Sequence, residues 1–403
     1  MLKRLCLVCL FLGYSVSAQF YPYNSRMESL AGTFIVDDMT DVLRYAAYMK
    51  NYPNDLQVTF TSPIIGVKAL NENFRLGVIG NRGLMLSQQF ATNFYSIAVP
   101  FVDSAIVAAP NISISNQWIP HVLLGVDAGI LTLGFDLFLE YARSRFKQEN
   151  PQEHTKAYAS IHNPGFLASA LFGDNFQFAA KFGLAVPMIS GKQESDSRTT
   201  EVESDKGVYL EFGGEATIPV SSVKVSLGAD LIMEKYAFIW DDTITQGSRS
   251  ADTTDEFSNS RIAIYAGIEG KIFTNGLWAA QYTLNLTGNT SENDGADLRI
   301  RASRIVHTFS GCIENGWENL WIFDKVYARG GMRLNLETPL SSEELGQTET
   351  HTKNQTYFNQ LVPTVGIGIC KGVFTLDLNI NLGQWDNLVT GPQVSRVTAG
   401  LMF

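Results

Sequence analysis

The last eleven residues, Gln393 to Phe403, read QVSRVTAGLMF. Val397, Ala399, Leu401 and Phe403 fall on one face of an extended chain, because successive side chains of a strand point to opposite sides. A strand that alternates in this way and ends on an aromatic residue is typical of the closing strand of an outer-membrane β-barrel, with lipid on one face and a polar lumen on the other. These four residues are therefore predicted to form the C-terminal insertion signal.

The same alternation of apolar and polar residues recurs along most of the chain. It runs through 131–141, 176–186, 223–233, 262–272, 278–286, 326–336 and 374–382. Soluble strands average about 5–6 residues, whereas a tilted membrane strand needs about 9–11. The length of these runs favours an all-β chain that forms a transmembrane, antiparallel, up-and-down β-barrel of about 14 strands.

Connections between these runs are expected to be short at one end of the barrel and long at the other. Short turns are predicted near residues 128, 174, 221, 274 and 372. Long polar loops are predicted at 144–156, 188–206, 241–259, 288–297, 338–356 and 384–393. Outer-membrane barrels place short turns in the periplasm and long loops outside the cell.

The N-terminus is expected to direct export. Lys3 and Arg4 precede a short apolar run, and Val16-Ser17-Ala18 resembles a signal-peptidase site, so residues 1–18 are predicted to be a removed signal peptide. Residues 19–54 lack the barrel pattern. Asp38 is predicted to cap a short helix over 39–51, within a plug in the barrel mouth. Residues 55–403 then form the barrel.

Composition and motifs argue against several functional classes. The net charge of −10 disfavours binding to nucleic acid, which needs clustered Lys and Arg. The sequence carries no zinc-protease, nucleophile-elbow, P-loop or Rossmann motif, and neither histidines nor cysteines have metal-ligand spacing. The sequence therefore predicts no enzyme, no cofactor and no metal. Cys312 and Cys370 are expected to be free thiols, with one disulfide as the alternative.

Charged residues within the strands are predicted to face the lumen. Acidic ones concentrate early and basic ones late, which allows either a transverse field across a polar pore or mutual pairing, including pairing with plug residues. The acidic members are Asp136, Glu140, Glu211, Glu215, Asp230, Glu234 and Glu269, and the basic members are Arg299, Arg301, Arg304, Arg329 and Arg333.

Residues 82–118 form a long insertion that is apolar. An exposed apolar segment of this size usually indicates binding, so Phe90, Phe94, Tyr95 and Phe101 are candidate contacts for a hydrophobic ligand. The alternatives are a structural hatch packed in the barrel top, or two further strands.

Several short motifs resemble a known family. They are Ser25-Arg26-Met27-Glu28-Ser29-Leu30-Ala31-Gly32, Val36-Asp37-Asp38-Met39-Thr40-Asp41, Tyr52-Pro53-Asn54-Asp55 and Gly366-x-Gly368. Together they resemble the long-chain fatty-acid transporter (FadL) superfamily of outer-membrane barrels, closest to PorV-like and uncharacterised Bacteroidota-type members. Tyr45-Ala46-Ala47 stands where that family has Asn-Pro-Ala. The resemblance implies a fourteen-stranded barrel with an N-terminal plug.

The sequence leads to three functional expectations for a barrel in the cell outer membrane. The first is passive uptake of small hydrophobic or amphiphilic solutes. The second, implied by the PorV-like resemblance, is a secretion shuttle that binds protein partners of a secretion system. The third is a structural barrel. The lipid bilayer and the barrel-assembly machinery are expected partners in every case.

Overall fold

The computed structural model describes most of the chain. The described residues are 25–59, 64–80, 113–116, 121–150, 153–174, 176–194, 198–244, 253–293, 298–345, 348–353, 357–381 and 393–403. Within them, no helix is long and apolar enough to cross a membrane.

The strands form one closed antiparallel sheet, since β1 pairs with both β2 and β19. In three cases two consecutive segments pair with the same neighbouring strand and count as one interrupted strand: β4 with β5, β8 with β9, and β16 with β17. The barrel therefore has 16 strands. This confirms the predicted fold class, with a count near the expected value. The segments are β1 (Asn54–Thr59), β2 (Ile64–Ala69), β3 (Phe74–Gly80), β4 (Ser113–Asn116), β5 (His121–Asp127), β6 (Leu131–Asn150), β7 (Glu153–Phe172), β8 (Gln177–Ala185), β9 (Met188–Glu194), β10 (Arg198–Val220), β11 (Val223–Ile244), β12 (Thr253–Ile272), β13 (Gly276–Asn293), β14 (Leu298–Glu318), β15 (Lys325–Leu345), β16 (Thr348–Lys353), β17 (Tyr357–Lys371), β18 (Phe374–Asn381) and β19 (Gln393–Met402).

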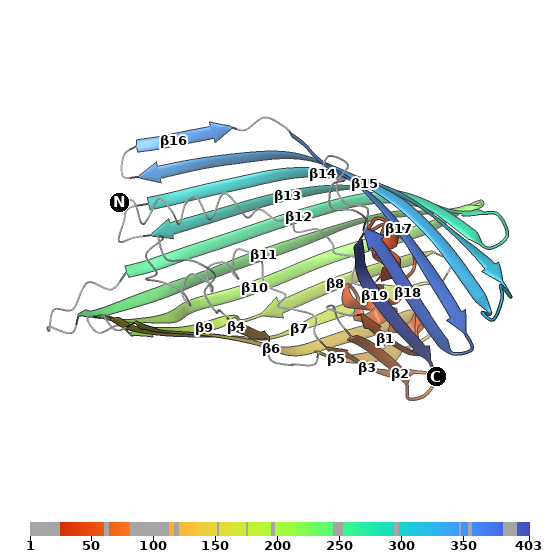
Figure 1. Ribbon diagram of the computed structural model, residues 1–403, viewed down its shortest axis with the longest axis horizontal. Helices are drawn as coiled ribbons and strands as arrows, with labels where there is room; N and C mark the ends of the chain where they lie inside the picture. The colour runs from red at the N-terminus through yellow and green to blue at the C-terminus, as the bar shows by residue number, and fades with distance from the viewer. Residues whose placement is uncertain are drawn as a thin grey trace.

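The wall is much taller on one side than on the other (Figure 1). Strand β10 has 23 residues and β11 has 22, whereas β18 has 8 and β1 has 6. At about 3.3 Å per residue, β10 is roughly 75 Å long, twice what a tilted strand needs to cross a bilayer. The short turns and the C-terminus lie at one end, here called the turn end; the opposite end is called the hairpin end.

The long loops predicted at the hairpin end are largely wrong. Residues 144–150 and 153–156 belong to β6 and β7, and most of 188–206, 241–259, 288–293 and 338–353 is also strand. The reason lies in the outer face of these extensions. Above a bilayer the outward side chains are polar, so the apolar period of 2 disappears although the hydrogen-bonded ladder continues.

The predicted turns at the turn end are present. Gly129 and Gly173 adopt φ angles of +85°, a left-handed conformation that favours glycine and reverses the chain within three or four residues. Exposed apolar side chains lie at these turns and at two turns that the sequence did not predict, residues 70–73 and 319–324. Their exposed fractions are 63% for Leu70, 64% for Ile130, 77% for Phe273 and 89% for Trp321.

The closing strand β19 completes the barrel against β1. Leu401 lies opposite Leu56, and the hydroxyls of Thr398 and Thr59 are 3.0 Å apart inside the barrel. Because Thr398 is buried on the inner face, Val397, Ala399 and Leu401 face outward, as the alternation predicts. The ring of Phe403 is half exposed and lies 4.7 Å from the ammonium of Lys68.

Candidate functional site: the plugged lumen

The N-terminal segment lies inside the barrel, where Figure 1 shows its red and orange turns behind β17, β18 and β19. It contains α2 (Ser25–Ser29) and two 3₁₀ helices, η1 (Met39–Leu43) and η2 (Ala46–Asn51). Asp38 caps η1: its carboxylate accepts from the Thr40 amide at 3.0 Å, and Asp41 accepts from the Asp38 amide at 3.0 Å. The structure therefore confirms a few helical turns here, split in two. Residues 25–53 are called the plug below.

The plug is buried as deeply as the core of a soluble domain. Tyr45, Ala46, Ala47 and Met49 are 0% exposed, although they belong to a segment with little regular structure. They form one cluster with inward-facing apolar side chains of the wall, namely Ile65, Val67, Ile79, Leu123, Leu171 and Ala179. The apolar contact holds the plug against the β1–β8 side of the lumen.

Three glycines of the wall give the plug backbone room to approach. A Cβ at Gly134 on β6 would overlap the backbone of Ala46 and Ala47. A Cβ at Gly331 would come close to the backbone of Leu30 and Ala31, and a Cβ at Gly366 would overlap the Ser29 side chain. The sequence alone could not assign these glycines, because each one is explained by a contact with a residue far away in the chain.

Substitution at Gly134 should therefore displace η2. We expect Gly134→Val to leave the barrel folded and heat-modifiable on a gel, while the plug becomes open to protease. The side chain must overlap backbone atoms, which cannot rotate away as a flexible side chain can. Gly330→Val is the matched control, because a Cβ there meets nothing within 4 Å. Equal protease resistance of the two variants would contradict this packing.

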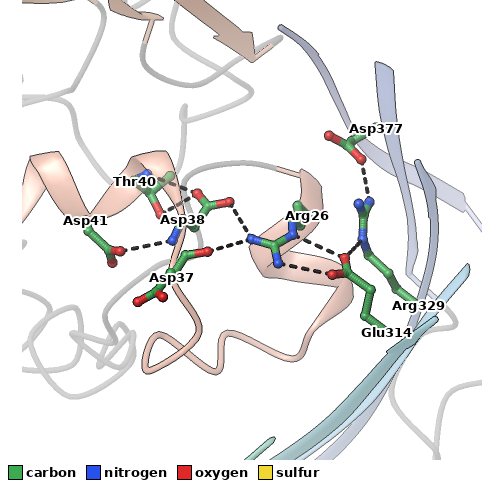
Figure 2. Close-up of polar contacts among 8 residues, drawn as sticks. All are labelled: Arg26, Asp37, Asp38, Thr40, Asp41, Glu314, Arg329 and Asp377. Carbon is green, nitrogen blue, oxygen red and sulfur yellow. Dashed lines mark hydrogen bonds and ion pairs between the residues drawn. The ribbon is translucent and has the colours of Figure 1, made fainter. Parts of the chain in front are cut away.

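An ion network joins α2 to the wall (Figure 2). The Arg26 guanidinium donates to both carboxylate oxygens of Glu314 on β14, each at 3.1 Å. It also donates to the Asp38 carboxylate at 3.2 Å and to the Asp37 carbonyl at 2.8 Å. Behind Glu314, Arg329 on β15 donates to Glu314 and to Asp377 on β18. One guanidinium thus connects two parts of the plug to three strands.

Burial alone would favour the uncharged form of the Arg26 guanidinium, and the neighbouring carboxylates reverse that effect. Although desolvation lowers the pKa of Arg26, Glu314 and Asp38 raise it well above its ordinary value. The guanidinium therefore stays charged. The forked geometry with Glu314 is the two-bond arrangement in which Arg binds carboxylates most strongly.

A second network joins η1 and η2 to another part of the wall, formed by β10 and β12. Arg44 donates to Glu215 on β10 at 2.8 Å and to the hydroxyl of Tyr265 on β12 at 2.6 Å. Glu215 also accepts from Tyr265 at 2.7 Å and from Tyr48 at 3.3 Å. The Arg44 guanidinium lies 4.6 Å from the ring centroid of Phe34. The plug is thus held by charged contacts at two places on the wall.

Lys181 on β8 continues the second network. Its ammonium contacts Glu211 and lies 2.9 Å from Asp230, and it lies 5.2 Å from the ring of Tyr45, the residue that precedes η2. Burial raises the pKa of Tyr45 to about 12, and the nearby Asp230 adds to that shift. Tyr45 is therefore a neutral phenol at physiological pH.

Most of the predicted lumenal charges are paired locally. Asp136 and Glu140 flank His121, whose Nδ1 lies 3.0 Å from Asp136 and whose Nε2 lies 3.5 Å from Glu140. Further pairs join Glu234 to Asn259, Glu269 to Lys224 and Arg304 to Glu337. This arrangement corresponds to mutual pairing, one of the two interpretations of these charges. His121 could not be identified as a partner of these carboxylates from the sequence, because nothing adjacent in the chain distinguishes it.

The prediction that Arg299 and Arg301 face the lumen is wrong. On β14 the even-numbered residues face inward, as the contacts of Cys312 and Glu314 with the plug establish, and β14 has no register shift. Arg299 and Arg301 therefore lie on the outer face, whereas Arg304 faces inward. On β15, Arg329 faces the lumen, where it contacts Glu314, and Arg333, four residues further along, faces the same way.

Some predicted features fall outside the described residues. Phe90, Phe94, Tyr95 and Phe101 are among them, so their role as ligand contacts stays a prediction. Cys312 and Cys370 are free thiols, as expected. Among the described residues, no group of His, Cys, Asp and Glu is arranged to hold a metal ion.

Comparisons with known proteins give only weak likenesses. No protein-family model and no curated protein matches the sequence. The translocator domain of the autotransporter NalP from Neisseria meningitidis is 11% identical over 69% of this chain and 90% of its own, with a TM-score of 0.27. Unliganded FecA, a ferric citrate transporter, is 8% identical over 81% of this chain and 64% of its own, with a TM-score of 0.34. FauA from Bordetella pertussis, an alcaligin outer-membrane receptor, is 8% identical over 87% of this chain and 75% of its own, with a TM-score of 0.25. Likenesses this weak carry no functional conclusion, and the barrel fold rests on the strand pairing itself.

Proposed function

We propose that this chain is an outer-membrane uptake barrel whose own N-terminal segment closes the lumen. The observation that supports it best is the plug, clamped by Arg26 and Arg44 to two separate strands of the wall, β14 and β10. Barrels of 16–18 strands are wide enough for an aqueous channel. In a barrel of this size the lumen can serve as the channel, and the plug that fills it can serve as the gate.

The outer surface supports insertion in a membrane. Large apolar side chains that are about half exposed face outward along β11 to β15, among them Leu227, Ile264, Ile313 and Met332. Inward-facing residues at the same level, such as Gln281 and Thr283, are polar. A soluble barrel has polar residues outside and apolar residues inside. The opposite arrangement found here matches the lipid-facing band of outer-membrane barrels. Trp321 and Phe273, highly exposed at the turn end, suit the membrane interface.

The ion networks support a gate rather than a permanent filler. Burying charged groups has a desolvation cost that well-packed apolar residues would avoid, so buried ion pairs are weak devices for stability alone. They do fix the plug in one position. They also allow a second defined state, in which the plug has left and wall carboxylates such as Glu314 and Glu215 are hydrated.

The proposed cargo is a small hydrophobic or amphiphilic solute. Its support comes from the sequence: the apolar insertion at 82–118, with Phe90, Phe94, Tyr95 and Phe101, and the resemblance to the FadL superfamily. The proposal requires no covalent chemistry and no cofactor.

A second candidate function, a barrel that binds protein partners, is favoured by one observation. Strands β10 to β15 continue about ten residues beyond what a bilayer needs. Such a wall offers a large surface outside the membrane, which a solute conduit does not require. A secretion shuttle of the PorV-like kind would use it to hold a client.

Binding of a fluorescent fatty acid tests the uptake proposal. The triple change of Phe90, Phe94 and Phe101 to Ser should weaken binding strongly, because each buried side chain contributes roughly 1.5–3 kcal/mol. The matched control changes the same residues to Leu, which keeps most of the apolar contact. The readouts are the dissociation constant in detergent and entry of the probe into proteoliposomes. If the unaltered protein neither binds nor passes any amphiphile, uptake is excluded and the partner-binding function takes its place.

A further inference from the structure

A hollow of about 730 Å³ lies across the outer face of β10 to β15. Most of its lining comes from two adjacent cross-strand rows. In the row nearer the turn end, Ser260, Gly288 and Ser303 lie side by side, with Met233 and Leu340 beyond them on either side. Small residues between large ones make the floor of the hollow.

The register places these side chains outside the barrel. Asp230 on β11, Tyr265 on β12 and Glu314 on β14 all face the lumen, where they contact the plug or Lys181. Residues an odd number of positions away on the same strands face the opposite way. That set includes Met233, Ser260 and Ser303. The hollow is thus separate from the plugged lumen.

The second row, nearer the hairpin end, carries the charge. It contains Lys235, Ser258, Thr290 and Arg301 on four successive strands. Lys235 forms an ion pair with Glu256 at 3.2 Å, and both side chains are about half exposed. Arg301 is exposed, and within the described part of the chain it has no hydrogen bond or ion pair. The two cations are three strand spacings apart, roughly 14 Å, with hydroxyls between them.

The hollow marks the boundary between an apolar and a charged surface. The next outward row toward the turn end is apolar from β10 to β14: Phe212, Leu231, Ile262, Leu286 and Ile305. The next row toward the hairpin end is charged on β12 to β14: Glu256, Glu292 and Arg299, with Arg299 bound to Glu292 at 2.6 Å. In a membrane-inserted barrel this change occurs where acyl chains give way to lipid headgroups.

We propose that this hollow binds the phosphorylated sugar headgroup of an outer-leaflet glycolipid. Arg301 supplies a planar guanidinium that no described residue binds, and a guanidinium binds phosphate through two parallel hydrogen bonds. Ser258, Ser260, Thr290 and Ser303 supply hydroxyls for the sugar, and the apolar row below receives the first segments of the acyl chains. The inference rests on the proposed membrane location, and it adds a specific lipid ligand to it.

Native mass spectrometry of the full chain in detergent tests this proposal, with lipid A and phosphatidylethanolamine as probes. The unaltered protein should retain lipid A in preference to phosphatidylethanolamine. Arg301→Gln should weaken lipid A binding about tenfold or more, because a charge-assisted hydrogen bond is lost. Ser303→Trp should fill the hollow and give a similar loss. Arg299→Gln is the matched control, on the same strand and face but already paired with Glu292, and it should bind as the unaltered protein does.

Three results would overturn the assignment. They are equal lipid A affinity of Arg301→Gln and the unaltered protein, equal loss in the Arg299→Gln control, and full displacement of lipid A by millimolar inorganic phosphate, which would identify a simple anion site. Reconstitution into phosphatidylethanolamine nanodiscs separates this inference from the function on which it rests. Insertion without lipid A preference defeats only the glycolipid site, whereas failure to insert defeats the membrane function itself.

Discussion

Replacing Thr33 by Cys should lock the plug to the barrel wall and stop solute passage until reductant is added. Thr33 lies between α2 and η1, and its hydroxyl contacts the thiol of Cys312 on β14. Cys312 is 5% exposed and packs among Leu30, Ile35 and Val36 of the plug. One substitution therefore creates a pair of thiols close enough for a disulfide, without a second engineered site.

The locked state can be compared with its own reduced form. Oxidation should give one species with altered gel mobility, and peptide mapping should find the Thr33→Cys to Cys312 link. Uptake of a fluorescent fatty acid into proteoliposomes should fall to background and return with dithiothreitol. Adding Cys312→Ser removes the lock and serves as the control, with Cys370 unchanged. Full uptake by the oxidised protein would mean that the plug stays in place during transport and the solute takes another route.

The barrel itself could be predicted from the sequence, because a lipid-facing strand has a strict chemical requirement. Each outward position must be apolar over the thickness of the bilayer, and the intervening lumenal positions tend to be polar. Residues 262–272 and 278–286 show this pattern, and they form β12 and β13. The closing strand was identifiable for the same reason, since Val397 and Ala399 alternate with the inward Thr398.

The height of the wall could not be predicted in this way. Outside a bilayer nothing requires the outward face to be apolar, so hydrogen-bonded strands there have the composition of loops. Residues 288–293 read as a polar loop, yet Gly288 and Thr290 lie in the ladder opposite Ser303 and Arg301. The expected lumenal placement of Arg301 failed for a related reason: its parity on β14 is clear only when the strand is known to continue beyond the apolar band.

The plug contacts were inaccessible to sequence reasoning because they join distant residues. Asp38 was a predictable cap, since its partners are two and three residues away. Arg26 and Glu314 are 288 residues apart, and no local pattern connects them. The sequence could suggest that lumenal charges pair with plug residues, and Lys224 on β11 does contact Asp37 at 2.7 Å. Nothing local, however, marked Arg26 and Arg44 as partners of wall carboxylates. The two arginines that bind the plug to the wall emerge only from the fold.

Arg26→Ala should release α2 and η1 from the wall while the barrel stays intact. Removing one partner of a fully buried ion pair typically costs about 3–5 kcal/mol, because the remaining charges lose their compensation. The cost is smaller here, since the Arg26 side chain is 21% exposed. Here Glu314 would keep Arg329, but the Asp38 carboxylate and the Asp37 carbonyl would lose their guanidinium donor together. The plug has its own apolar contacts around Met49, so we expect its first half to detach and η2 to stay docked.

Limited proteolysis of the folded, heat-modifiable barrel measures this effect, with cleavage expected between residues 25 and 41. Lys50→Ala is the matched control, because it also removes a cation from the plug. The partner of Lys50 is Asp174, whose side chain is 73% exposed to solvent. An exposed pair contributes only about 0–1 kcal/mol, so the control should resist protease like the unaltered protein. If conductance of a small ion in planar bilayers rises in Arg26→Ala and not in Lys50→Ala, the Arg26 network keeps the lumen closed. Equal conductance in both variants, despite cleavage in the first, would assign the closure to η2 and its apolar cluster instead.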